Sequence, residues 1–218
     1  MGPALVGGTS LSLLTVTPPD DDGGMATSYG CLVCGGVGGF LCAGCWRRLR
    51  RVPAAVAGVV GFDICRSLLV YDERAAPLLT RLKYRNERVA LGWLADGMAG
   101  LIEPPDGAIV TWMPTTPRRR RKRGFDQAEL LARAVARRWK RSCVRVLARR
   151  SGLPQTGRSR EDRLVGVDLR LVRPARRDVP VVLVDDVLTT GTTLRCGAAV
   201  LRSAGVPWIG GLTAARRP

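Results

Sequence analysis

The sequence predicts an α/β protein with a mostly parallel sheet flanked by helices, preceded by a small cysteine module. Residues 181–184 are apolar at every position, which is typical of a strand covered on both faces, as in a parallel sheet. Leu194, Ala198 and Leu201 follow at helical spacing, so a helix comes after this strand. A second apolar run at 109–113 precedes an amphipathic segment at 127–140, and this strand-then-helix order favours a layered α/β fold.

Length and composition place the chain among globular proteins. Its 218 residues suffice for one sizeable domain and a small module, and 46% of them are apolar. Residues 1–29 show no periodicity and contain an acidic run at 20–22, so we expect this segment to be poorly ordered, with Met25 as an alternative start to Met1. No apolar run is long enough for a membrane span and the start lacks the basic residues of a signal peptide, which predicts a cytoplasmic protein without membrane insertion.

The positive charge is concentrated in one region. The chain carries 35 Lys and Arg against 18 Asp and Glu, and residues 115–177 hold 21 of the basic and 5 of the acidic side chains. The rest of the chain is therefore nearly neutral. This stretch predicts an anionic partner, which is pyrophosphate, nucleic acid or both, although solvated arginine-rich faces would give the same composition.

Two C-x-x-C pairs are separated by seven residues near the start of the chain. Their spacing predicts a structural tetrahedral zinc site, because each pair supplies two thiolates from one tight turn and the chain contains no histidine. A pair of disulfides and an iron–sulfur cluster remain as alternatives. We expect a zinc-ribbon-like module over 30–55 and the main domain over 56–218. The four ligands are Cys31, Cys34, Cys42 and Cys45.

Apolar spacing and turn residues predict the other elements. We expect the strand at 109–113 in the centre of the sheet, the Arg-rich residues 149–178 as a loop over the site, and Arg216 and Arg217 in a frayed tail. The remaining expected elements are a short basic helix at 46–51, a strand at 64–71, helices at 76–84 and 88–102, a short strand at 143–147 and a last strand at 206–213.

The most informative stretch follows the strand at 181–184. Asp185 and Asp186 come at its carboxyl end, where open α/β sheets bind their ligands, and two adjacent carboxylates accept from a ribose diol or hold Mg²⁺ through water. The next loop offers backbone N–H groups and hydroxyls at a helix N-terminus, an arrangement that binds phosphate. A ribose 5-phosphate needs both features; an ordinary turn with a threonine N-cap is the alternative. The loop consists of Thr189, Thr190, Gly191, Thr192 and Thr193.

The stretch from Asp185 to Thr193 resembles the motif with which type I phosphoribosyltransferases bind 5-phosphoribosyl 1-pyrophosphate (PRPP). The resemblance implies a type I phosphoribosyltransferase-like fold, with the acidic pair as the catalytic residues on the ribose, the Thr/Gly loop on the 5-phosphate, and Mg²⁺ bound with PRPP. It also implies that the basic loop at 114–123 lies beside the pyrophosphate. The candidate cations there are Lys83, Arg118 and Arg123.

A wider resemblance covers roughly residues 30–215. The cysteine module, Leu82-Lys83-Tyr84, Arg123-Gly-Phe-Asp-Gln-Ala128, the segment 155–163 and the PRPP motif occur in the same order as in the ComF (competence protein F, GntX-like) family. The chain departs from that family at Asp126, where Asn is usual, and at Gly166, where a second Asn is usual. Thr115 and Thr116 stand near the place where the family often has a His.

Two functions follow from these resemblances. The first is an enzyme that transfers phosphoribosyl from PRPP to a nucleophile, which the sequence does not name. The second, which the ComF resemblance implies, is the handling of incoming single-stranded DNA in natural transformation. Trp46 would then stack on bases, although a Trp46 packed on its own module is the alternative. We favour a PRPP-binding fold that works in DNA uptake. The basic residues around Trp46 are Arg47, Arg48, Arg50 and Arg51.

Overall fold

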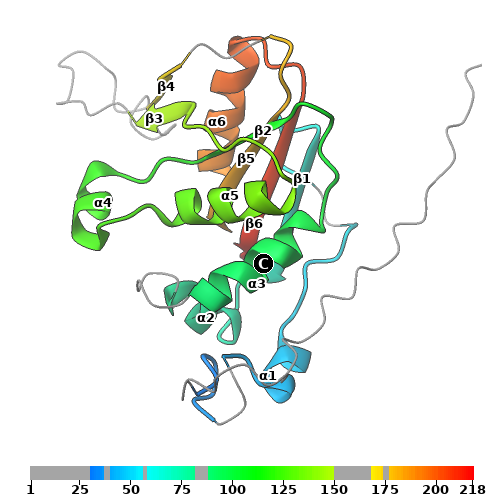
Figure 1. Ribbon diagram of the computed structural model, residues 1–218, viewed down its shortest axis with the longest axis vertical. Helices are drawn as coiled ribbons and strands as arrows, with labels where there is room; N and C mark the ends of the chain where they lie inside the picture. The colour runs from blue at the N-terminus through cyan, green and yellow to red at the C-terminus, as the bar shows by residue number, and fades with distance from the viewer. Residues whose placement is uncertain (1–29, 37–39, 56–57, 82–87, 150–167, 174–176) are drawn as a thin grey trace, which may run out of the picture.

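The computed structural model describes residues 30–36, 40–55, 58–81, 88–149, 168–173 and 177–218 (Figure 1). The main sheet has four parallel strands in the order β1 (Ile64–Val70), β6 (Ile209–Arg216), β5 (Val181–Leu188) and β2 (Ile109–Trp112). A second, antiparallel pair is formed by β3 (Leu147–Arg149) and β4 (Leu169–Leu171). The predicted α/β fold with a parallel sheet is therefore confirmed.

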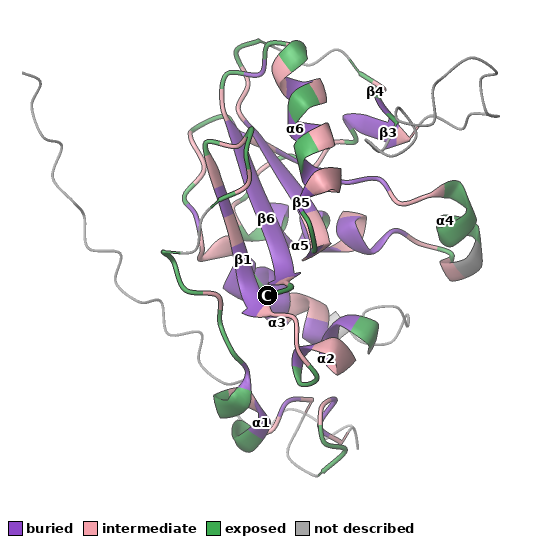
Figure 2. Cartoon of the chain, turned by 180° about the vertical axis from the view of Figure 1, so that it is seen from behind, coloured by how far each residue is buried: buried purple, intermediate pink, exposed green. Residues whose placement is uncertain are grey.

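Helices cover both faces of the sheet. The helices α3 (Arg88–Ala99) and α5 (Gln127–Arg138) lie on one face, and α6 (Thr192–Ser203) lies on the other (Figure 1). Alternate residues of a strand point to opposite faces, so Val182 and Val184 pack in the core under α3 and α5, whereas Val181 and Leu183 pack under α6. Figure 2 shows that the strands are buried. Because β5 is covered on both faces, its run Val181–Val184 is apolar at every position.

Three short helices are α1 (Ala43–Arg48), α2 (Ala75–Arg81) and α4 (Pro117–Arg123). From the sequence, the basic residues of α4 are predicted to form a loop, and this prediction is wrong. Thr116 caps α4 by accepting from the Arg119 N–H at 3.3 Å, proline occupies the first helical position, and Gly124 ends the helix with a φ of 78°. Figure 1 and Figure 2 both show α4 standing away from the sheet and its covering helices.

The strands also differ from their expected bounds. β5 continues four residues past Val184, because β6 pairs with it as far as Leu188 and Arg216. Arg216 therefore belongs to β6, and the Arg217 N–H donates to the Leu188 carbonyl at 2.9 Å, so these residues are not a frayed tail. In the part of the chain that the structure describes, β2 lies at the outer side of the sheet and not in its centre.

The segment expected as a strand at 143–147 contributes one parallel bridge, between Cys143 and Val110, and the strand proper begins at Leu147. The other side of the sheet, at β1, is accompanied by residues 50–52. The Val52 N–H donates to the Leu68 carbonyl at 3.2 Å and the Val70 N–H donates to the Arg50 carbonyl at 2.8 Å. Among the described residues, no helix combines the length and the apolar character that a membrane crossing requires.

Candidate functional site

The acidic pair lies in the second half of β5, directly after the apolar run Val181–Val184. Asp185 is in register with Thr213 of β6, which in turn is in register with Ser67 of β1. The hydroxyl oxygens of Ser67 and Thr213 are 2.6 Å apart, so a polar row crosses three strands on one face. The Asp186 N–H donates to Asp185 Oδ1 at 2.9 Å, and the Val187 N–H donates to Asp186 Oδ1 at 2.8 Å. Both carboxylates are therefore held in place by the backbone.

The negative charges of Asp185 and Asp186 would be stabilised by a cation or by hydroxyl donors. Burial raises the pKa of the Asp185 carboxyl well above its ordinary value, and the negative charges of Asp186 and Asp126 act in the same direction. Three carboxylates thus converge on one region. A ligand that needs Asp185 ionised, such as Mg²⁺ or a ribose diol, should bind more tightly as the pH rises through this raised pKa.

The turn between β5 and α6 consists of Thr189, Thr190 and Gly191. Gly191 has a φ of 77°, a conformation that a residue with a Cβ rarely adopts, and it starts α6 without a capping side chain. The Thr192 N–H donates to the Thr190 hydroxyl at 3.4 Å, and the following N–H groups of the first turn have no capping side chain and can donate to an anion. The Thr190 and Thr192 hydroxyl oxygens are 3.0 Å apart, and Arg195 donates to the Thr192 hydroxyl at 3.1 Å. Arg195 is not among the residues predicted from the sequence, although its position three residues after Thr192 on a helix indicates it.

The connection after β2 is held by side chains from two other elements. The Thr115 N–H donates to Asp126 Oδ2 at 2.8 Å, and Arg149 Nε donates to the Pro114 carbonyl at 2.7 Å. Asp126 also caps α5, because its Oδ1 accepts from the Ala128 N–H at 3.2 Å. Each carboxylate oxygen thus accepts from a different backbone N–H. An asparagine has only one acceptor oxygen, which gives a physical reason for the acid at this position.

The cations predicted for the pyrophosphate lie in different surroundings. Lys83 falls outside the described residues. Arg123 donates to the Gln127 side chain at 2.8 Å, and Gln127 in turn donates to the Leu79 carbonyl at 3.4 Å. Arg118 is exposed on α4. The assignment of these three residues to the pyrophosphate stays a prediction.

The four cysteines of the N-terminal module converge on one point. Their sulfur atoms all lie within 4.8 Å of one another, and those of Cys34 and Cys42 are 3.8 Å apart. Metal–sulfur bonds of about 2.3 Å in a tetrahedron place sulfurs about 3.8 Å apart, so the cluster fits zinc. The turn that forms it needs glycine twice. Gly35 has a φ of 75°, and a Cβ on Gly30 would lie 2.5 Å from the Gly35 carbonyl oxygen.

Backbone N–H groups prepare these sulfurs as ligands. The Cys42 N–H donates to the Cys31 sulfur at 3.4 Å, and the Cys45 N–H donates to the Cys42 sulfur at 3.5 Å. Burial acts to raise the pKa of the Cys31 thiol, but hydrogen bonds from the backbone outweigh it and lower this pKa to about 6. Burial and the neighbouring cysteines raise the pKa of Cys45 to about 12. A cation among the sulfurs would favour the thiolate form of Cys45, as a bound metal does.

The cysteine module shares its core with the main domain. Cys31, Leu41 and Leu49 belong to the same buried cluster as the side chains under α3. The Trp46 ring meets the Trp93 ring of α3 edge to face, with centroids 5.2 Å apart, and the guanidinium of Arg51 lies 4.8 Å from the centre of the Trp46 ring. Trp46 is thus engaged on the protein, which favours packing over base stacking.

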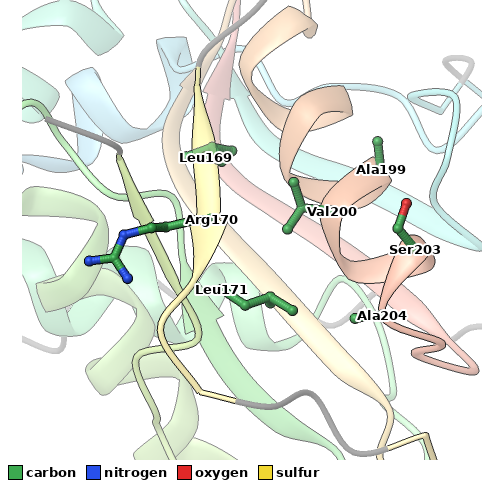
Figure 3. Close-up of a pocket in the computed structure, with 7 residues that line it drawn as sticks. All are labelled: Leu169, Arg170, Leu171, Ala199, Val200, Ser203 and Ala204. Carbon is green, nitrogen blue, oxygen red and sulfur yellow. The ribbon is translucent and has the colours of Figure 1, made fainter. Parts of the chain in front are cut away.

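An open hollow lies between β4 and the carboxyl-terminal half of α6 (Figure 3). Its first lining residue on the helix, Ala199, follows Thr192 by about two helical turns, so the hollow is separate from the motif loop. The Arg170 side chain points away from the helix in this view. The hollow is lined by Leu169, Arg170, Leu171, Ala199, Val200, Ser203 and Ala204.

No protein-family model and no curated protein matches the chain. Among solved structures, it is similar to a hypoxanthine phosphoribosyltransferase from Staphylococcus aureus, with 14% identity, a TM-score of 0.35, and coverage of 65% of this chain and 64% of that one. The chain thus spans just under two thirds of the length of that protein. It is also similar to an adenine phosphoribosyltransferase from Thermoanaerobacter pseudethanolicus, with 17% identity, a TM-score of 0.38, and coverage of 78% and 81%.

Proposed function

We propose that the protein binds PRPP with Mg²⁺ at the carboxyl end of its parallel sheet, in the manner of a type I phosphoribosyltransferase. One observation carries this proposal. The acidic pair of β5 and the first turn of α6 are joined by the short turn between Leu188 and Thr192, so carboxylates and phosphate donors lie at the same edge of the sheet. A ribose 5-phosphate is the common ligand that offers a diol to the first and a phosphate to the second.

Each part of the site has a role in this proposal. Asp185 and Asp186 accept hydrogen bonds from the ribose hydroxyls, whereas Thr190, Thr192 and Arg195 bind the 5-phosphate. Bound Mg²⁺ would supply positive charge to the pyrophosphate. With an acceptor nucleophile present, the bond between the ribose C1 and the pyrophosphate oxygen would break while the bond to the nucleophile forms. Positioning and charge stabilisation would then account for the catalysis.

Calorimetric titration of zinc-loaded protein tests the proposal. PRPP with Mg²⁺ should bind with a dissociation constant of about a micromolar, which corresponds to about 8 kcal/mol. Ribose 5-phosphate and pyrophosphate should each bind more weakly than PRPP, because each fills only part of the site. If folded protein shows no heat with any of the three ligands, the acidic pair and the turn do not form a PRPP site.

A second candidate function rests on α4. The four side chains Arg118, Arg119, Arg120 and Arg121 are exposed, and within the described ranges none of them makes a hydrogen bond or ion pair. We propose that this projecting helix binds the phosphates of single-stranded DNA in the cytoplasm during DNA uptake, as the ComF resemblance implies. If binding is electrostatic, the affinity for single-stranded DNA should fall steeply as the salt concentration rises.

Replacing the four α4 arginines with glutamine should flatten that salt dependence. Each phosphate contact to single-stranded DNA contributes about 0.7 to the slope of log affinity against log salt concentration, so the slope should fall by about 3. Fluorescence anisotropy with a labelled oligonucleotide measures it. The matched control removes the same charge from exposed positions elsewhere. A control with the same loss of slope would mean that net charge, and not α4, governs binding. The control positions are Lys140, Arg145, Arg170 and Arg177.

A further inference from the structure

The chain that enters β1 from the cysteine module first runs along α6. Asp63, just before β1, accepts from the Ile209 N–H at 2.7 Å and forms an ion pair with Arg202 in the last turn of α6. Two residues earlier the chain is close to the middle of the same helix, because a Cβ on Gly61 would lie 3.3 Å from the Ala198 Cβ. This segment therefore follows α6 from its middle to its last turn.

Val59 extends the path to the turn that begins α6. A Cβ on Gly191 would lie 3.5 Å and 3.7 Å from the two methyl carbons of Val59, and 3.5 Å from the Leu188 Cδ1. Val59 packs on the apolar cluster under α6, and its carbonyl accepts from the Phe62 N–H at 3.3 Å. The buried Gly191 is thus packed between a side chain of β5 and a side chain from the segment before β1.

The turn between β5 and α6 has an inner and an outer side. Gly191 is buried, whereas Thr189 and Thr190 are exposed, so a ligand reaches the turn from the threonine side. The Gly191 carbonyl accepts from the Arg195 N–H at 2.8 Å, which makes this residue the start of the hydrogen-bond ladder of α6. The orientation of the first N–H groups of the helix therefore depends on the backbone of Gly191, and Val59 packs against that backbone from the inner side.

We propose that Val59 is a positioning residue for the anion-binding turn, which holds Gly191 so that the first N–H groups of α6 point at the phosphate. Val59 acts through Gly191 and not on the ligand. Glycine has more backbone freedom than any other residue, so a glycine at the centre of a binding turn needs packing to stay in one conformation. The inference rests on the proposed function for the identity of the anion, but not for the effect of Val59 on the turn.

Amide hydrogen exchange of ligand-free protein tests the effect on the turn. Val59→Ala removes both methyl carbons of the contact, and the control Val60→Ala removes the same groups from a neighbouring side chain that is 80% exposed. The Val181 N–H, which donates to the Trp208 carbonyl at the other end of β5, reports on opening of the whole sheet. In Val59→Ala, exchange of the Arg195 N–H should become about tenfold faster relative to that of Val181. In Val60→Ala the ratio of the two rates should equal the wild-type ratio.

Two results would overturn the proposal. The first is an unchanged ratio in Val59→Ala, and the second is an equal rise in Val60→Ala. A further variant, Val59→Thr, keeps the branched shape but replaces one methyl group with a hydroxyl, so it should give a smaller rise than Val59→Ala. If Val59→Ala does not fold, Val59→Thr decides, and an unchanged ratio in that variant would likewise contradict the role of Val59.

Calorimetry separates positioning from a general loosening of the protein. Val59→Ala should bind ribose 5-phosphate about tenfold more weakly than the wild type, because a displaced donor costs affinity for the group that it holds. Its affinity for Mg²⁺ pyrophosphate should be unchanged, since the proposed pyrophosphate side lies elsewhere in the site. An equal loss for both ligands would contradict the inference. If the wild type binds neither ligand, the proposed function fails, while the exchange rates still decide the role of Val59.

Discussion

The double variant Asp185→Asn/Asp186→Asn should bind Mg²⁺ and PRPP at least about a hundredfold more weakly than the wild type. Hydrogen bonds to charged groups contribute about 1.5–3 kcal/mol each, and the loss of two of them corresponds to a factor of that size. Calorimetry at pH 8, where the raised pKa of Asp185 limits ionisation least, measures the loss. Equal affinity in the variant would show that the acidic pair does not contact the ligand.

The same variant provides its own test of folding. The raised pKa of Asp185 means that the folded state binds its proton more tightly than the unfolded chain does. The wild type should therefore lose stability as the pH rises from the ordinary carboxyl range through the raised pKa, and the double amide should not. Thermal unfolding at pH 5 and pH 8 should show a variant that is at least as stable as the wild type at the higher pH. A variant less stable than the wild type at pH 8 would mean that the two carboxylates stabilise the folded protein.

Removal of the metal from the cysteine cluster should have the largest effect on stability. Structural zinc contributes apparent binding free energies of about 10–16 kcal/mol in small zinc modules, so Cys45→Ser or a strong chelator should unfold the module. Loss of the Trp46–Trp93 contact would then expose part of the core under α3. We expect one zinc per chain by elemental analysis and a marked fall in melting temperature when it is lost. Acid should release the metal as well, because protons compete for the thiolates.

Two controls separate the metal from the alternatives. Cys143→Ser changes a half-buried thiol outside the cluster and should leave the zinc content unchanged. Visible absorbance would reveal an iron–sulfur cluster, and a thiol count in the denatured protein would reveal disulfides. A protein with neither zinc nor iron, and with all thiols free, would contradict a metal role for the four cysteines.

Local patterns predicted the parts of the structure that local chemistry determines. The apolar run of β5, the spacing of α6 and the two C-x-x-C turns each depend on neighbouring residues, and each is found in the structure. The length of β5 was underestimated, because its polar half is a strand only through pairing with β6. The helix α4 was predicted as a loop because six of its seven residues are Arg or Lys, although Thr116 and Gly124 indicate both ends of a helix.

The assembly of the site could not be predicted from the sequence alone. Arg149 is separated from Pro114 by 35 positions, and its Nε reaches the Pro114 carbonyl only because the segment that leads into β3 runs beside β2. The role of Asp126 likewise depends on the Thr115 N–H, which reaches it from the preceding connection. Spacing identifies residues that act together on one element, whereas contacts between elements depend on strand order and register.

The pairing of residues 50–52 with β1 has a consequence for self-association. A strand at the side of a sheet carries free N–H and C=O groups, and it recruits strands from other molecules unless something occupies them. Here the chain that leaves the cysteine module occupies part of the β1 edge, through the Val52–Leu68 and Arg50–Val70 hydrogen bonds. The cysteine module would therefore have a protective role far from its cysteines, since a chain in which it unfolds also uncovers this edge. Damage to the cluster would then lead to edge-to-edge aggregation as well as to unfolding.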